Sequence, residues 1–140
     1  MGHTHPAGVN ALLCSTVADL VTAGSLFPDQ IVVLGRHRIL IDYADPGLVL
    51  ARGVRERLRL HGAKHCAVPK AIYLRNHGLF ALGSSPDEVK RITVMAEKCA
   101  QVLLGASAVG EVVFLSDSDA ERIDIRPDEL YRRTLLIGPA

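Results

Sequence analysis

The chain has 140 residues, an apolar content of 49% and a formal net charge of +1 at pH 7. This length predicts one domain over residues 1–140, with enough apolar side chains for a core. A charge so close to zero gives no electrostatic basis for binding nucleic acid or an anionic membrane surface. No apolar run reaches the length needed to span a bilayer, and no secretory signal pattern opens the chain.

The first half of the chain predicts two helices and one interrupted strand. Pro6 suits the first turn of a helix whose apolar period continues to a stop at Gly24. A short β-branched run over 31–34 predicts a strand, which Gly35 breaks and which resumes over 39–41. Asp45 and Pro46 then resemble a cap and a first helical residue, and that helix is expected to end at Gly62.

The second half predicts a pair of strands followed by helices. Strands are expected over 71–74 and 79–82. Ser85, Pro86 and Glu88 form a capping box that opens a long amphipathic helix to Gly105. Ser116 is a plausible cap for a helical turn through Glu121, and a last helix is expected over 127–136. Short strands and helices without clear βαβ units favour an α/β layered fold whose sheet is mainly antiparallel.

The cysteines indicate a reducing compartment. Cys14, Cys66 and Cys99 are odd in number and widely spaced, which is unlike a disulfide framework. Cys14 and Cys99 fall on helix faces that are expected to be buried. We therefore expect a cytoplasmic protein.

Three histidines predict a divalent metal site. In an extended segment, residues i and i+2 project to the same side, so His3 and His5 are able to grip one ion together. His77, within Asn76-His77-Gly78, supplies a third imidazole. A catalytic zinc uses three protein ligands and keeps a position open for water or substrate. The alternative, that Met1-Gly2-His3 is the scar of a purification tag, is disfavoured by the smooth continuation into Pro6 and the following helix.

A rival metal cluster is weaker. His61 and His65, at i and i+4, would share a helix face next to Cys66. However, the expected helix end at Gly62 breaks that geometry, and polar residues at a helix end are common there. His37, between two arginines, is interpreted as a solvated residue of a turn.

Several segments carry a resemblance to the class II aldolase and adducin family, which covers nearly the whole chain. At the start of the chain it is carried by His3-Thr4-His5-Pro6 with Asn10-Ala11-Leu12, and around the Asn-His-Gly motif by Leu74–Gly83. Three shorter runs also carry it: Leu26–Val32, Tyr43–Gly47 and Arg126–Tyr131. The resemblance implies a three-layer α/β/α fold with a mainly antiparallel central sheet. In the family the His-x-His pair lies in the middle of the domain. We therefore expect this chain to be the C-terminal portion of a partial, N-terminally truncated domain.

The resemblance implies zinc, or another divalent metal, held by His3, His5 and His77. Such an ion polarises a carbonyl and stabilises an enediolate, giving aldol cleavage of a ketose phosphate to dihydroxyacetone phosphate and an aldehyde. The family's catalytic glutamate and phosphate loop would lie upstream of this chain, so the residue that moves the proton is unknown here. Glu88, Glu97 and Glu111 are expected to be surface residues.

Sugar aldolases of the family also use a tyrosine that reaches into a neighbouring subunit, shortly after a stretch like Leu26–Val32, and this chain lacks it. The closest position in this chain is Val32, and no tyrosine precedes Tyr43. We therefore expect very low turnover from this chain alone. Two alternatives stay open: a pentose-phosphate epimerase of the same family, or a non-catalytic interaction module like that of adducin. The resemblance also implies a homo-oligomer, with a tetramer favoured, that binds a small sugar phosphate.

Overall fold

The computed structural model describes residues 1–137, and they build a four-stranded sheet. The strands are β1 (Gly2–Thr4), β2 (Ile39–Ile41), β3 (Ala71–Leu74) and β4 (Gly78–Ala81), in the order β1-β4-β3-β2. β4 pairs antiparallel with both β1 and β3, whereas β2 pairs parallel with β3. The expected mainly antiparallel sheet is confirmed, with the refinement that one edge pair makes it mixed.

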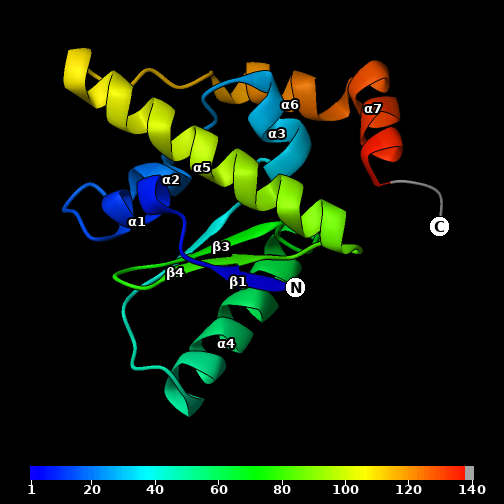
Figure 1. Cartoon of the computed structure of the whole chain (residues 1–140). Coiled ribbons are helices and arrows are strands. Elements are labelled where there is room, and N and C mark those ends of the chain that lie inside the picture. Colours follow the sequence, from blue (N-terminus) through cyan, green and yellow to red (C-terminus); the bar gives the residue numbers. More distant parts are fainter. Residues whose placement is uncertain (138–140) are drawn as a thin grey trace.

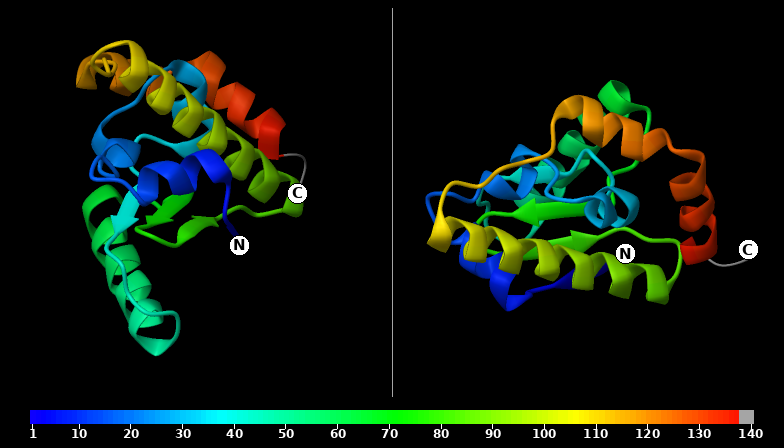
Figure 2. Two further views of the ribbon diagram at one scale, coloured as in Figure 1. Left: turned by 60° about the vertical axis from the view of Figure 1, so that its left-hand side comes forward. Right: turned by 90° about the horizontal axis from the view of Figure 1, so that it is seen from above.

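Helices cover both faces of this sheet, as the three-layer prediction requires (Figure 1). One face carries four helices: α1 (Ala7–Leu13), α2 (Leu20–Ala23), α3 (Pro28–Leu34) and α5 (Pro86–Val109). The other face carries α4 (Leu48–His65), which projects beyond the sheet in Figure 1 and in the left view of Figure 2. The last helices are α6 (Asp117–Ile125) and α7 (Pro127–Ile137), which pack near α3.

Two apolar cores follow from these layers. The larger core lies between the sheet and the helices α1 and α5, and its most buried members include Val9, Leu12, Leu34, Tyr73, Leu79, Ile92 and Leu103. The smaller core joins the opposite face of β2 and β3 to α4 through Ile39, Ile41, Leu50, Ile72 and Leu74. Consecutive strand residues point to opposite faces, so β3 serves both cores at once.

The long helix α5 is apolar enough to meet a length-and-composition test for a membrane span. Its apolar positions have another explanation. Ile92, Ala96, Cys99 and Leu103 recur at helical spacing and are buried in the larger core. The central helix of a folded domain passes the same test.

The prediction of a strand over 31–34 is wrong. These residues form α3, with Pro28 in its first turn and Asp29 beside it. A short apolar run does not by itself separate a strand from a buried helix. Here the main contacts of α3 are with the helices α5, α6 and α7, and not with a neighbouring strand.

The first expected helix is divided in two. α1 ends at Leu13, because the Ser15 hydroxyl donates to the carbonyl of Leu12 and accepts from the N–H of Val17. The N–H of Asn76, in the turn between β3 and β4, donates to the carbonyl of Leu13. This break leaves Cys14 exposed, contrary to expectation, whereas Cys99 is buried as expected.

The helices α4 and α5 both extend beyond the glycines, Gly62 and Gly105, at which they were expected to end. α4 begins after Gly47, continues through Gly62 and ends at His65, with Cys66 in the left-handed conformation at φ 51°. α5 likewise passes through Gly105. Glycine within a helix costs only about 1 kcal/mol relative to alanine, which packing easily offsets.

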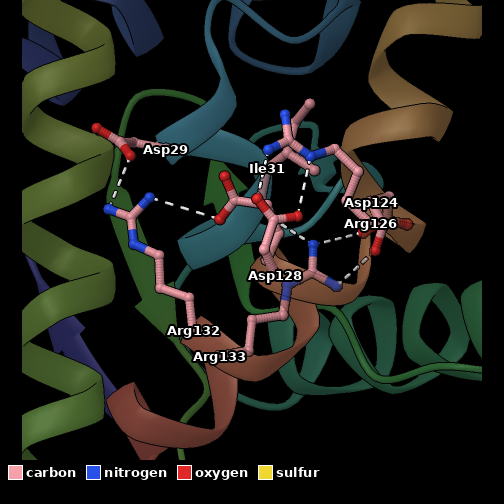
Figure 3. Close-up of polar contacts among 8 residues, drawn as sticks. Asp29, Ile31, Asp124, Arg126, Asp128, Arg132 and Arg133 are labelled. Carbon is pink, nitrogen blue, oxygen red and sulfur yellow. Dashed lines mark hydrogen bonds and ion pairs between the residues drawn. The ribbon is translucent and has the colours of Figure 1, made fainter.

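Charged side chains fasten α7 to the rest of the domain (Figure 3). Arg133 donates to the carboxylate of Asp124 at 2.6 Å and to the carbonyl of Ile31 at 3.4 Å. Arg132 pairs with Asp29 at 2.9 Å. These contacts tie α7 to both α6 and α3.

Candidate metal site

The structure brings His3, His5 and His77 together. One ring nitrogen from each lies within 4.8 Å of the others. The Nε2 atoms of His3 and His77 are 3.2 Å apart. Two nitrogens bound tetrahedrally to zinc at 2.0–2.1 Å would be about 3.3 Å apart, so this pair already fits one ion. We call these residues the histidine triad.

Strand pairing positions His3. β1 pairs with β4 so that His3 lies opposite Phe80 and Thr4 opposite Leu79. The Nδ1 of His3 lies 3.1 Å from the carbonyl oxygen of Leu79. A carbonyl only accepts, so Nδ1 carries the proton and Nε2 keeps its lone pair for a ligand. This is the outer hydrogen bond that orients metal-binding histidines in proteins.

A tight turn positions His77 against His5. Asn76 adopts the left-handed conformation at φ 52°, and the N–H of His77 donates to the carbonyl of Leu74. A Cβ at Gly78 would lie 2.5 Å from the His5 ring and 2.7 Å from the carbonyl oxygen of Thr4. Only glycine allows this close approach, which explains the last residue of the Asn-His-Gly motif.

The environment favours neutral imidazole at His77. Burial lowers the pKa of His77, and the neighbouring His3 and His5 lower it further. Neutral imidazole is the form that binds a metal. His3 and His5 are exposed, so the triad is open to solvent on one side and has room for a water or a substrate oxygen.

Glu97, expected at the surface, instead tethers the segment that carries His5. Its carboxylate oxygens accept from the backbone N–H groups of Gly8 at 3.0 Å and Val9 at 3.1 Å. These groups belong to the first turn of α1, where a negative charge is stabilising. Glu97 thereby joins α5 to the residues that directly follow His5 and Pro6.

Replacing Glu97 with alanine is expected to lower the free energy of unfolding by about 2 kcal/mol, because two hydrogen bonds to a charged group are lost. Zinc affinity at the triad should fall as well, since the His5 segment loses its anchor. Urea unfolding and competition with a chromophoric chelator measure the two effects. The exposed Glu111→Ala is the matched control. Equal behaviour of both variants would contradict the tether.

The prediction that Glu88 lies at the surface is wrong, whereas Glu111 is exposed as expected. The Glu88 carboxylate binds the ammonium of Lys70 and accepts from the backbone N–H and the hydroxyl of Ser84. Burial alone would raise the pKa of Glu88, but these bonds outweigh it and lower the pKa to about 2. Glu88 is therefore an ionised structural residue. Within residues 1–137, no carboxylate hydrogen-bonds to the triad.

Comparison with known proteins adds a family and a fold. The model of the class II aldolase and adducin N-terminal domain matches residues 2–104, a range that contains the whole triad. No curated protein matches the sequence at a significant level.

Solved structures share the fold at low identity. YgbL from Klebsiella pneumoniae, described as a candidate aldolase, epimerase or decarboxylase, has a TM-score of 0.65 at 21% identity and covers 86% of this chain and 55% of its own. An L-fuculose 1-phosphate aldolase has a TM-score of 0.61 at 24% identity, over 87% of this chain and 52% of its own. A sugar-phosphate aldolase from Thermotoga maritima has a TM-score of 0.62 at 21% identity, over 78% and 45%.

The chain thus spans about half the length of these relatives. Identities at this level establish the shared fold only. The family match covers far more than half of the chain, and it begins one residue before the first histidine of the triad. By this match, the chain belongs to the class II aldolase and adducin family.

Proposed function

We propose that this chain carries the metal-binding part of a zinc-dependent aldolase that cleaves a ketose phosphate to dihydroxyacetone phosphate and an aldehyde. The observation that carries the proposal is the histidine triad, in which two ring nitrogens already have the spacing of zinc ligands. Family membership and the likeness to sugar-phosphate aldolases support the choice of reaction.

A divalent ion on His3, His5 and His77 would supply Lewis acidity to stabilise negative charge developing on a substrate oxygen. The chain's own residues hold the ligands ready for it. The hydrogen bond to Leu79 sets the tautomer of His3. The Asn76 turn directs His77 toward His3.

The described residues offer no free carboxylate near the triad for proton transfer. A general base must lie within hydrogen-bond reach of the proton that it removes. Within residues 1–137, Glu88 is already bound by Lys70 and Ser84, and Glu97 by the first turn of α1. We therefore expect metal binding to be retained and turnover to be slow, since general acid–base catalysis contributes typically 10²–10⁴-fold.

Product analysis tests the reaction. The chain is stripped of metal, reloaded with Zn²⁺ and incubated with fuculose 1-phosphate, rhamnulose 1-phosphate or a pentulose 5-phosphate. Zinc-dependent release of dihydroxyacetone phosphate, detected by a coupled reductase, is the expected result. An epimerised pentose phosphate without cleavage would show that the activity is that of an epimerase and not of an aldolase. Zinc binding with neither product would favour a non-catalytic interaction module.

Assembly and compartment remain expectations of this proposal. A homo-oligomer, with a tetramer favoured, agrees with the exposure of Leu48 and Val49 on α4, at 66% and 68%. Such apolar residues at a protein surface are a common feature of subunit contacts. The cytoplasm remains the expected location, and a sugar phosphate the expected small-molecule partner.

A further inference from the structure

A second group of histidines lies at the end of the strands opposite to the triad. His37 precedes β2, while His61 and His65 lie on the last turns of α4. Lys70, directly before β3, lines the same hollow as these histidines. His77 of the triad follows the other end of β3. We call His37, His61 and His65 the second histidine cluster.

The continuation of α4 places His61 and His65 on the same face of one helix. The helix passes through Gly62 and ends at His65, which removes the objection to this pair raised by the sequence. Residues i and i+4 are neighbours on one helix face. The ring centroids of His61 and His65 are 4.8 Å apart. Two histidines at this spacing are the helical arrangement used by metal sites of the His-x-x-x-His type.

His37 completes the cluster from a different segment. Its ring stacks on that of His65 with centroids 3.8 Å apart and an interplanar angle of 17°. Within residues 1–137, none of the three imidazoles makes a hydrogen bond, although His61 is only 8% exposed. The ring nitrogens of His61 nevertheless remain accessible to solvent, because His61 lines the wall of a hollow.

The cluster opens into a hollow of about 360 Å³, which has room for an ion and several waters. His61 and His65 also line a second, adjacent hollow. An ion therefore has a path from solvent to both side chains.

Three cationic side chains, Arg36, Lys70 and Arg133, line the hollow, and two of them are engaged elsewhere. Arg38 donates to the carbonyls of Val21, Gly35, Arg36 and Gly24. Lys70 is paired with Glu88, and Arg133 with Asp124. Arg36 is thus the one lining cation whose side chain makes no ion pair within residues 1–137, and a single cation is a poor anion site. The C-terminal end of α4 also presents free carbonyls, whose partial negative charge favours a cation.

We propose that the second histidine cluster binds a divalent late transition-metal ion, held by His61 and His65 with His37 as the third ligand. Imidazole nitrogen suits Zn²⁺, Ni²⁺ and Cu²⁺ rather than Mg²⁺ or Ca²⁺. His37 is exposed and must turn out of its stack to aim a nitrogen at the ion, and exposed side chains make such turns in picoseconds to nanoseconds.

Counting bound ions tests the proposal independently of any enzymatic activity. Equilibrium dialysis against Zn²⁺ with elemental analysis should give two ions per chain for the natural sequence. His77→Ala should keep one ion, at the second cluster, and His61→Ala with His65→Ala should keep one, at the triad. Combining all three substitutions should leave none. Lys64→Ala, exposed on the same turn of α4, is the matched control and should keep two.

In the His77→Ala chain, Cu²⁺ should show nitrogen hyperfine splitting in electron paramagnetic resonance. Adding His37→Ala to that chain should lower its Cu²⁺ affinity at least about 10-fold, because loss of a hydrogen bond to a metal ligand alone costs that much. This exposed position tolerates alanine, so the test stands even where the buried His61 variant fails to fold. One ion per natural chain, lost in His77→Ala, would overturn the proposal. The proposal would also fail if the His77→Ala chain kept the same metal affinity after His37→Ala and His65→Ala were added.

Discussion

The His77→Ala chain is expected to lose zinc affinity at the triad by more than about 100-fold, because loss of an outer contact alone costs 10–100-fold. His77 contributes a nitrogen 3.2 Å from that of His3, and the pair defines the position of the ion. Any zinc-dependent turnover should disappear with it. His3 and His5 alone are exposed and leave the ion held by a short edge strand.

Competition with a chelator at pH 7.5 measures this loss, with the second histidine cluster removed to leave one site. Asn76→Gly is the matched control, because glycine adopts the same left-handed conformation and keeps the turn. Retention of tight zinc binding by the His77→Ala chain would show that the ion is held elsewhere.

Glu88→Gln is expected to lower the free energy of unfolding at pH 7 by about 3 kcal/mol, because breaking a buried pair leaves an uncompensated charge. The Glu88 side chain is 9% exposed, whereas that of Lys70 is 38% exposed. Water therefore reaches the lysine and keeps the loss at the lower end of the range for buried pairs.

This stabilisation depends on pH in a defined window. The pKa of Glu88 is lowered from 4.5 to about 2 in the folded chain. A carboxylate whose pKa is depressed by folding stabilises the fold above its unfolded pKa. The contribution is thus complete above about pH 5 and is lost as the pH falls from 4.5 toward 2.

Urea unfolding at pH 7, 4 and 3 separates this effect from general acid sensitivity. The natural chain should lose more stability on acidification than Glu88→Gln, and the two curves should approach each other. Asp87→Asn changes an exposed carboxylate in the same helical turn and is the matched control. Parallel curves for Glu88→Gln and the natural chain would rule out the lowered pKa.

Sequence reasoning identified residues whose roles depend on local pattern. The i, i+2 spacing of His3 and His5 and the capping box at Ser85 need only the geometry of a strand and a helix start. The strand geometry and the Ser85 cap appear in the structure, where Ser85 accepts from the N–H of Glu88. The other half of the capping box differs, because the Glu88 carboxylate accepts from the N–H of Ser84 rather than of Ser85. Placing His77 beside His3 rested on ligand count and was strengthened by the family resemblance, because nothing local links residues so far apart.

The errors share one physical origin, which is tertiary packing. α3 is a helix that packs among α5, α6 and α7, and no local period reveals that packing. Glu88 appeared to be a surface residue because its partner, Lys70, lies in a loop before β3. α4 continues past Gly62 because a single glycine is too weak a signal to end a packed helix. That error concealed the second histidine cluster.

The pairing of β1 with β4 makes the bound ion a cross-link. β1 is three residues long, lies at the edge of the sheet and hydrogen-bonds on one side only among the described strands. An ion on His3 and His77 joins positions 74 residues apart in the chain and closes that loop. Closing a loop of this length in the unfolded state is worth about 4 kcal/mol when the link is covalent. Metal loading should therefore act like a removable disulfide, which holds β1 on the sheet and releases it when the ion is withdrawn.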